Sequence, residues 1–335
     1  MVSVKEALNG LGLDKERLTE MLYKMMLSRA VGERQRMLNR MGKGPFAVTG
    51  EGHEATQIGT TSALTPGKDW LFPYYRDAGV ALTIGLTARE LMLEFLSRAE
   101  SVSSAGRNMP SHFSDTKLRV VSGSAPVATQ IPHAVGTAFA SKLRGLDEVS
   151  MTWFGDGATS KGDCHESMNF AGVHKLPVVF VCEHNQYAIS VHWTKQMAVE
   201  NVSIRAQGYG FPGVTVDGND LLAVYRAAKE AVDRARAGEG PTFIECKTYR
   251  LVPHTSDDDD RRYRSREEVA EWAKKDPIPR FQAYLEEEGV LDAGAGESLA
   301  KRVAQEVDEA TDYADNAPSP DPESALSHVF VEEEA

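Results

Sequence analysis

The sequence predicts an α/β fold, with a mostly parallel sheet covered by helices on both faces. Three apolar runs predict buried strands, at residues 149–154, 177–182 and 241–248. Helical patterns at 130–143, 160–175 and 221–237 alternate with them. Continuous apolar runs are typical of parallel strands buried on both faces. Strands that alternate with helices indicate one layered sheet.

Helical extensions are expected on both sides of this core. Residues 14–40 carry apolar side chains at helical spacing, including several methionines whose favoured role is core packing, and Gly42 and Gly44 end that pattern. Capping-box sequences at 87–90 and 265–268 predict two further helix starts. The expected organisation is an N-terminal helical arm at 1–45, an α/β core at 46–264, and a C-terminal helical extension with a loose tail at 265–335. The extensions are expected to serve subunit contacts.

Composition excludes several classes of protein. The net charge of −12 argues against nucleic acid as a ligand. The apolar runs are far too short to cross a membrane, and the first six residues contain no signal segment, so we expect a cytoplasmic protein without membrane contact. The three cysteines are widely spaced, which predicts buried free thiols rather than a zinc site or a disulfide framework.

Polar residues follow two of the predicted strands. Gly155-Asp156-Gly157 comes directly after the first strand, and His184-Asn185 follows the second. Open α/β sheets bind ligands at the carboxyl ends of their strands. A carboxylate and an amide there can both bind a hard cation through oxygen, and Mg²⁺ held this way commonly also contacts phosphate oxygens. Taken alone, each motif is more often a turn; their spacing favours a diphosphate–Mg²⁺ site.

This spacing resembles the thiamin diphosphate motif. Residues Leu13 to Leu291 resemble the alpha subunits of the decarboxylating component of 2-oxo acid dehydrogenase complexes, most closely around Gly155–Ser160 and Asn185–Ser190. His184 departs from the family, which usually has a second Asn there. The resemblance implies the thiamin diphosphate-binding fold. It also implies that Asp156, Asn185 and the backbone oxygen of Tyr187 bind Mg²⁺, and that Gly155, Gly157 and Ala158 contact the cofactor.

Further site residues follow from the same resemblance. Tyr75 and Arg76 match the residues that hold the diphosphate, and the planar guanidinium suits phosphate oxygens. Backbone groups of Ala125 and Val127 would meet the aminopyrimidine ring. A K⁺ site is implied at Ser124, Pro126, Thr129 and Gln130, although the residues themselves favour a capped helix start.

His254 follows the strand at 241–248 and matches the family's catalytic histidine beside the cofactor, although a single loop histidine is more often only structural. Imidazole can donate or carry a proton near neutral pH. Phe46 is a candidate wall of the substrate pocket. His53, at an expected helix start, is interpreted as a cap or packing residue rather than a catalyst. The charged loop at 257–264 resembles the loop over the active-site mouth; it could order itself through internal ion pairs, and we expect cofactor or lipoyl-domain binding to order it.

The resemblance implies an enzyme. Its reaction would be thiamin diphosphate-dependent oxidative decarboxylation of a 2-oxo acid, with reductive acylation of a lipoyl group on a partner transacylase. The partner beta subunit would complete an α₂β₂ heterotetramer. The sequence at 106–110, 124–132 and 254–264 favours branched-chain substrates over pyruvate or acetoin. Two alternatives remain: a non-catalytic cofactor-binding scaffold, and a Mg²⁺-nucleotide enzyme, against which the missing phosphate-loop motif counts.

Overall fold

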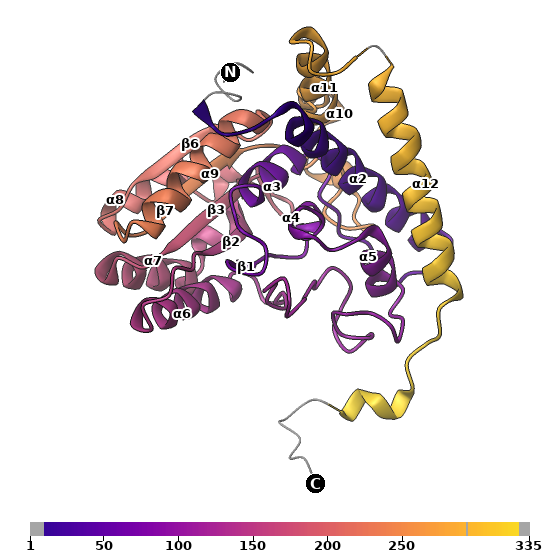
Figure 1. Cartoon of the computed structure of the whole chain (residues 1–335), viewed down its shortest axis with the longest axis horizontal. Helices are drawn as coiled ribbons and strands as arrows, with labels where there is room; N and C mark the ends of the chain where they lie inside the picture. Colours follow the sequence, from indigo (N-terminus) through magenta and orange to yellow (C-terminus); the bar gives the residue numbers. More distant parts are fainter. Residues whose placement is uncertain (1–9, 293, 328–335) are drawn as a thin grey trace.

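A computed structural model describes residues 10–292 and 294–327 of the chain. Its main sheet has five strands in the order β1-β2-β3-β7-β6, and every neighbouring pair is parallel (Figure 1). The strands span Trp70–Phe72, Ser150–Gly155, Val178–His184, Thr242–Lys247 and Gly213–Asp217, in that order. All of β3 is buried, as expected of a central strand covered on both faces. The predicted fold class is therefore confirmed.

Two helices cover one face of the sheet. α6 (Gln130–Leu143) and α7 (Gly162–His174) pack on side chains that include Phe154, Phe180 and Phe243. The helical pattern at 160–175 divides into two pieces, because a 3₁₀ turn, η1 (Asp156–Ser160), precedes α7. That turn carries the residues that follow β2, so the helix starts only after the polar motif.

The opposite face packs against α9 (Leu221–Arg236) and a group of helices made from earlier residues. These are α3 (Glu54–Thr61), α4 (Ala78–Ile84) and α5 (Ala88–Phe95). Met151, Trp153, Val179 and Val181 alternate along their strands with the side chains of the first face, as strand geometry requires. The two layers of helices and the sheet between them can be followed in Figure 1.

The terminal extensions pack directly on this core. The helix expected at 14–40 is α2 (Lys15–Arg40), capped by Asp14. The C-terminal helices are α10 (Arg266–Ala273), α11 (Pro277–Glu287) and α12 (Ala295–Asn316), and α12 runs beside α2 and α5 in Figure 1. Met21 and Met25 are buried, whereas Met37 is exposed, so the packing role predicted for the methionines holds for only part of the helix.

Several short elements were not expected from the sequence. These are the edge strand β6, the hairpin of β4 (Tyr187–Ala188) with β5 (Val191–His192), the helices α4 and α8 (Arg205–Gly208), and the 3₁₀ turns η2 (Trp193–Lys195), η3 (Val202–Ile204), η4 (Asp260–Arg262) and η5 (Pro322–Leu326). β6 has only five residues and is mostly exposed, so it lacks the apolar run that identifies the central strands.

The two expected capping boxes differ. At Thr87 both halves form: the hydroxyl accepts from the backbone N–H of Glu90, and the Glu90 carboxylate accepts from that of Thr87. Ser265 likewise accepts from the backbone N–H of Glu268 at 3.1 Å. The Glu268 carboxylate, however, points to two tyrosine hydroxyls instead of returning to Ser265. Only half of the second box is therefore present, because its acid is used elsewhere.

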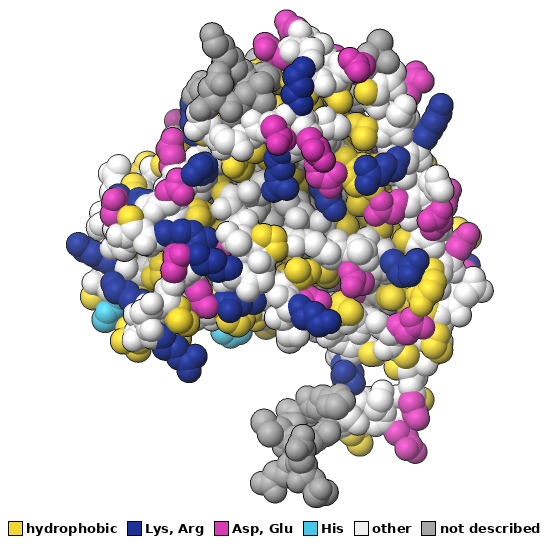
Figure 2. All heavy atoms as spheres, viewed as in Figure 1, with side chains coloured by type: hydrophobic (Ala, Val, Ile, Leu, Met, Phe, Trp, Pro, Cys, Tyr) yellow, Lys and Arg dark blue, Asp and Glu magenta, His cyan; other side chains and the backbone are white. Residues whose placement is uncertain are grey.

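Other expectations concern the surface and the ends of the chain. The three cysteines are buried and free, as predicted. Lys and Arg side chains are interspersed with Asp and Glu over the face in Figure 2. Within the described ranges no helix is long and apolar enough to cross a membrane. The segment after α12 extends from the body and includes η5, while the N-terminal residues 1–9 and the acidic tail at 332–334 lie outside the described residues.

Candidate functional site

A cavity of 270 Å³ lies at the carboxyl edge of the sheet, where β2, β3 and β7 end. It brings together segments that are distant in the chain, as the position of the predicted site requires. Its lining includes Tyr75, Arg76, Ser124, Val127, Gln130, Gly155, Gly157, Ala158, Asn185, Tyr187 and His254, all of which are predicted site residues. Lys161, Ala188, Ile189 and Arg250 also line it and were not predicted.

Asp156 is not among the residues that line the cavity, but it lies between Gly155 and Gly157, which do, and its exposed fraction is 0%. Neither of its carboxylate oxygens accepts a well-formed hydrogen bond from the described residues, although backbone N–H groups of residues 156 and 185 lie nearby. Burial raises the pKa of this carboxyl. Because a buried carboxylate without partners is unfavourable, this side chain could serve as a ligand for a cation.

Asn185 faces the same region and is held by His53. The side-chain amide nitrogen of Asn185 lies 3.0 Å from Nε2 of His53, while Nδ1 of His53 lies 3.1 Å from the Gly50 carbonyl. Nδ1 must donate to that carbonyl, so Nε2 accepts from the amide. Burial and the nearby Arg76 lower the His53 pKa to about 3, which keeps this ring neutral. The amide oxygen of Asn185 is thereby directed away from His53.

His53 stands at the N-cap of α3 but makes no side-chain cap bond, so a capping role is wrong. It is buried and holds the Asn185 amide instead. Gly52 before it has φ +97°, and a Cβ there would lie 2.1 Å from the Tyr249 carbonyl oxygen. Only glycine allows the backbone at position 52 to approach the Tyr249 carbonyl this closely. The next residue, His53, then contacts the Asn185 amide. Nothing in the local sequence pattern signals this contact, because it joins residues 132 positions apart.

Two buried guanidinium groups face the cavity. Arg76 donates to the Thr49 and His254 carbonyls at 3.0 Å each. Arg250 donates to the Ile189 carbonyl at 2.7 Å and to the Tyr263 hydroxyl at 3.1 Å. Neither forms an ion pair with a carboxylate of the described chain. Burial and the charge of Arg76 lower the Arg250 pKa to about 10.

The missing countercharge indicates an anionic ligand. Arg side chains are planar forks that match phosphate oxygens, and two of them beside a neutral histidine attract a highly charged group. The ring of Tyr75 lies 5.2 Å from the Arg76 guanidinium and lines the same cavity. Arg250 was missed by sequence reasoning. Its signal was an arginine two residues beyond the end of a predicted central strand, at the ligand-binding edge.

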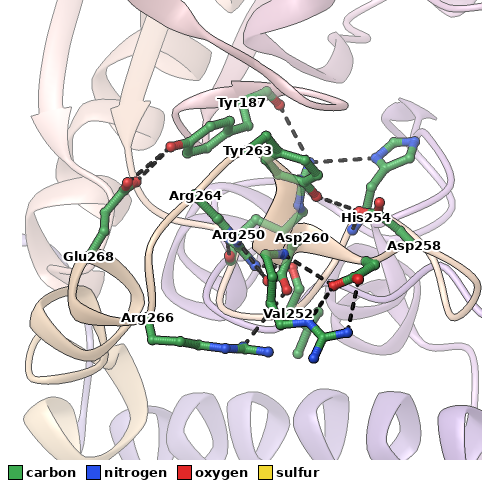
Figure 3. Close-up of polar contacts among 12 residues, drawn as sticks. Tyr187, Arg250, Val252, His254, Asp258, Asp260, Tyr263, Arg264, Arg266 and Glu268 are labelled. Atoms are coloured by element: carbon green, nitrogen blue, oxygen red, sulfur yellow. Dashed lines mark hydrogen bonds and ion pairs between the residues drawn. The ribbon is translucent and has the colours of Figure 1, made fainter.

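His254 lies between the guanidinium groups of Arg76 and Arg250, and Figure 3 shows its contact with Arg250. Its Nδ1 is 2.7 Å from Nη2 of Arg76 and 3.5 Å from Nη1 of Arg250. Burial, followed by the repulsion of the two guanidinium groups, lowers the His254 pKa to about 3. The backbone N–H of His254 donates to Asp258 at 2.9 Å. The ring is therefore neutral near pH 7 in this structure.

His184, at the family's usual Asn position, turns away from the cavity. Its Nδ1 lies 2.6 Å from Glu245 and 3.0 Å from Nζ of Lys247, so it belongs to a buried ionic network between β3 and β7. Burial alone would raise the pKa of Glu245, but hydrogen bonds from His184 and Lys247 lower it to about 2. Histidine in place of the family's usual Asn at position 184 therefore does not change the position of Asn185, which lines the cavity.

The remaining predicted residues divide into two groups. Gln130 is buried, donates to the Trp153 carbonyl at 2.9 Å, and has a side-chain oxygen without a partner among the described residues. Ala125, Pro126, Thr129 and Phe46 are absent from the cavity lining within the described chain. Residue 47, next to Phe46, exchanges backbone and hydroxyl hydrogen bonds with Ser256, which places that segment beside the His254 loop. The K⁺ and substrate roles stay predictions.

The charged loop after His254 is folded on itself, as its sequence suggested. Arg264 forms a buried ion pair with Asp260 at 2.7 Å and donates to the carbonyls of Arg250 and Val252. Asp258 accepts from the Tyr263 hydroxyl, and Asp259 pairs with Arg261. Figure 3 shows these contacts around Arg250. Whether ligand binding changes this order stays a prediction.

Fold and site together define an α/β protein with a buried acid, two unpaired guanidinium groups and a neutral histidine at one sheet edge. Comparison with known proteins specifies the family. The chain belongs to the family described as dehydrogenase E1 component, which matches residues 23–323. It is accordingly a component of an oxidoreductase enzyme, and the family implies thiamin diphosphate as its cofactor.

Similar proteins cover nearly the whole chain. The 2-oxoisovalerate dehydrogenase subunit alpha of Bacillus subtilis (strain 168) is 51% identical over 321 residues, which are 96% of this chain and 97% of the relative. The 3-methyl-2-oxobutanoate dehydrogenase subunit alpha of Mycobacterium tuberculosis is 40% identical over 93% of this chain and 82% of the relative. The pyruvate dehydrogenase E1 component subunit alpha of Staphylococcus aureus is 40% identical over 91% and 80%, respectively.

The residues present fit a diphosphate cofactor with a divalent cation. Asp156 supplies a buried carboxylate without strong partners, and Arg76 and Arg250 supply positive charge without a carboxylate of the described chain. At Gly157 a Cβ would lie 2.9 Å from the Cβ of Ala188, so glycine allows the two cavity-lining segments to approach closely. The acid, the two arginines and the close approach at Gly157 are each consistent with a diphosphate bound together with a divalent cation.

Proposed function

We propose that this chain is the alpha subunit of a branched-chain 2-oxo acid dehydrogenase. The observation that carries this proposal is the similarity to a relative named 2-oxoisovalerate dehydrogenase subunit alpha. The two sequences are 51% identical over 96% of this chain and 97% of the relative. The reaction is oxidative decarboxylation of 3-methyl-2-oxobutanoate and related acids, followed by reductive acylation of a lipoyl group on a transacylase. The cavity at the sheet edge is the site of the first stage.

The proposed roles follow from the geometry. Asp156, Asn185 and the backbone oxygen of Tyr187 bind Mg²⁺, a cation that prefers such oxygen ligands. Tyr75, Arg76 and Arg250 bind the diphosphate. When bound, thiamin diphosphate supplies the nucleophilic carbon for the 2-oxo group and the cationic ring that accepts electrons as carbon dioxide leaves. His254 presents a neutral imidazole that can donate a proton to developing negative charge.

Further expectations belong to the same proposal. Gln130, with Ser124, Pro126 and Thr129, holds a K⁺ ion beside the cofactor, and the unpartnered oxygen of Gln130 supports this role. Phe46 forms part of the substrate wall. The backbones of Ala125 and Val127 contact the aminopyrimidine ring. The protein works in the cytoplasm, which cell fractionation tests.

A beta subunit and a lipoyl-bearing transacylase are the expected partners, with an α₂β₂ arrangement. Val127 and Ile189 line the cavity yet are 47% and 59% exposed, which supports a mouth that a second chain covers. Exposed apolar side chains at a ligand site are typical of surfaces that a partner completes. The alpha chain alone is therefore expected to be inactive, and sedimentation of the co-expressed pair measures the stoichiometry.

Pyruvate is the second candidate substrate, because one relative at 40% identity is named a pyruvate dehydrogenase component. The deciding experiment co-expresses this chain with its beta subunit. Turnover of 3-methyl-2-oxobutanoate and of pyruvate is then compared with thiamin diphosphate, Mg²⁺ and an artificial electron acceptor. Preference for the branched substrate supports the proposal. Preference for pyruvate would keep the proposed reaction but make pyruvate its substrate. Cofactor binding without turnover of either acid would favour a non-catalytic scaffold, and ATP binding in place of thiamin diphosphate would favour a nucleotide enzyme.

A further inference from the structure

The turn that carries two proposed metal ligands is conformationally strained. Residues 185–189 run from the end of β3 through β4 into the bend of the β4–β5 hairpin, and two non-glycine residues of this segment have positive φ: Gln186 at 77° and Ile189 at 57°. A β-branched residue such as isoleucine is unfavourable in this conformation. Such strain persists only where surrounding contacts determine the backbone. The contacts around this turn are therefore part of the site.

Some of these contacts come from the core. The backbone N–H of Tyr187 donates to the side-chain oxygen of Asn185 at 3.2 Å, and that of Trp193 donates to the Gln186 carbonyl at 3.0 Å. Arg250 donates to the carbonyl of Ile189 at 2.7 Å and approaches that of Tyr187 at 3.5 Å. The core thus fixes both ends of the turn through its backbone.

The side chain of Tyr187 is fixed from outside the core. Its hydroxyl lies 2.9 and 3.0 Å from the two carboxylate oxygens of Glu268 and donates its one hydrogen to that carboxylate (Figure 3). Glu268 lies in the first turn of α10 in the C-terminal extension. The hydroxyl of Tyr249 donates to the same carboxylate at 2.9 Å. One acid therefore joins the metal-ligand turn to the segment that leads to His254.

Aromatic packing surrounds these hydroxyl contacts. The ring of Tyr249 stacks on Trp272 of α10 at 5.1 Å with an interplanar angle of 5°. The Arg264 guanidinium lies 5.2 Å from the Tyr249 ring and 6.0 Å from the Tyr187 ring. Tyr187 and Tyr249 are 4% and 1% exposed, so their hydroxyl groups depend on protein partners. Glu268 is the acceptor that both use.

The half-formed capping box supports a role beyond helix stability. A Glu at this position normally returns to the N-cap backbone, as Glu90 does at Thr87. Glu268 gives up that stabilising contact and satisfies two buried hydroxyls instead. The helix keeps only the bond from its own backbone N–H to Ser265. The Glu268 carboxylate therefore points toward the active site, where the Tyr187 and Tyr249 hydroxyls hold it.

We propose that Glu268 is a positioning residue for the divalent cation, holding the 185–189 turn through the Tyr187 hydroxyl so that the Tyr187 backbone oxygen and Asn185 face the metal. This role rests on the proposed function. Outer contacts that orient metal ligands typically contribute about 10- to 100-fold to metal affinity. Loss of Glu268 lets the strained turn relax and lowers the affinity for Mg²⁺, while the diphosphate donors Arg76 and Arg250 stay in place.

The test uses the full alpha chain co-expressed with its beta subunit. Tryptophan fluorescence measures cofactor binding, once by titrating Mg²⁺ at saturating thiamin diphosphate and once by the reverse titration. Glu268→Ala and Tyr187→Phe should each raise the half-saturating Mg²⁺ concentration about tenfold or more. Glu268→Gln, which keeps one acceptor oxygen, should recover part of this loss. Glu271→Ala is the matched control, because Glu271 lies on the same helix, is 69% exposed and pairs only with Lys274.

Hydrogen exchange supplies a readout that is independent of activity. Without cofactor, residues 185–189 should exchange faster in Glu268→Ala and Tyr187→Phe than in the wild type, and the control should match the wild type. Unchanged Mg²⁺ dependence in both variants, or an equal loss in the control, would overturn the positioning role. Failure of the wild-type complex to bind thiamin diphosphate with Mg²⁺ would instead overturn the proposed function itself. Tyr187→Phe keeps the test valid if Glu268→Ala does not fold.

Discussion

Nη2 of Arg76 lies 2.7 Å from Nδ1 of His254, and this contact determines which ring nitrogen carries a proton. A guanidinium group can only donate, so Nδ1 accepts and the single proton of the neutral ring is on Nε2. Burial and the two nearby arginines lower the His254 pKa to about 3, so the assignment holds across neutral pH. Arg76 thus prepares His254 as a hydrogen-bond donor.

His254→Asn tests this role. Asparagine can still accept from Arg76 but places no donor at the position of Nε2. We expect kcat with an artificial electron acceptor to fall about 100-fold or more, while calorimetric affinity for thiamin diphosphate with Mg²⁺ changes only a few-fold. His133→Asn, at an exposed position on α6, is the control. A variant that keeps wild-type kcat would exclude His254 from the chemistry.

Arg250→Lys tests the second guanidinium. Lysine keeps the charge but loses the planar fork, so it cannot reproduce the contacts to Ile189 and Tyr263 together with phosphate. We expect cofactor affinity to fall about tenfold, because hydrogen bonds to charged groups contribute about 1.5–3 kcal/mol. Arg261→Lys, whose side chain is 68% exposed, should have no effect. Equal affinity of the wild type and Arg250→Lys would place the diphosphate elsewhere.

Asp156→Asn should separate stability from function. The wild-type carboxylate is buried without strong partners, so the amide should stabilise the cofactor-free protein by about 1–3 kcal/mol. The same change removes a proposed Mg²⁺ ligand, so Mg²⁺ with thiamin diphosphate should no longer raise the melting temperature. Thermal melts of both proteins, with and without these ligands, make the comparison. A variant that is less stable without ligand and still responds to Mg²⁺ would contradict the assignment.

Glu94, which is not among the residues that line the cavity, predicts a pH dependence of the protein's stability. Burial raises its pKa from 4.5 to about 7, and one of its oxygens has no partner in the described structure. The folded state therefore holds a proton that the unfolded state releases between pH 4.5 and 7, so this contribution to stability is lost as pH rises through that window. The total is on the order of 3 kcal/mol.

Glu94→Gln removes this titration. In urea unfolding, the variant and the wild type should be similar near pH 4.5, and the variant should be more stable at pH 8. A parallel pH dependence in both proteins would show that Glu94 ionises normally. The matched control is Glu230→Gln, at an exposed position on α9, because Glu90 on the same helix as Glu94 forms a capping box.

An ionic network joins the terminal extensions to the core. Arg29 of α2 pairs with buried Glu54 at 2.5 Å and with Asp276 before α11 at 2.9 Å. Arg29→Met leaves Glu54 without its partner and should destabilise the chain by about 3–5 kcal/mol. The double variant Arg29→Met/Glu54→Gln should recover part of this loss in a double-mutant cycle. Strict additivity of the two single changes would mean that the pair is not coupled.

The central elements could be predicted because their signals are local. β2, β3 and β7 are continuous apolar runs, and α6, α7 and α9 have amphipathic or small-residue patterns between them. The start of α3 at His53 was expected but its extent was not, since its sequence, Glu54–Thr61, combines β-branched residues with glycine and all eight residues are buried. Without an exposed face there is no helical periodicity to detect, and tertiary packing overrides weak propensity.

The candidate site shows the same division. Asp156, Asn185 and His254 could be located because each follows a strand, and parallel strands end at one edge. Arg250 follows the same rule but was not assigned. His53 and Glu268 gave misleading local signals, as a cap and as half of a capping box, because their partners lie 132 and 81 residues away.

The sequence by itself determined the α/β class, the order of the central strands and helices, and the residues at the ligand-binding edge. Those features depend on periodicity and on spacing within short segments. The tertiary structure decided the tautomer of His254, the orientation of the Asn185 amide and the reach of Glu268 into the active site. Each of these depends on a hydrogen bond between segments that meet only when the chain folds, so no local pattern encodes it.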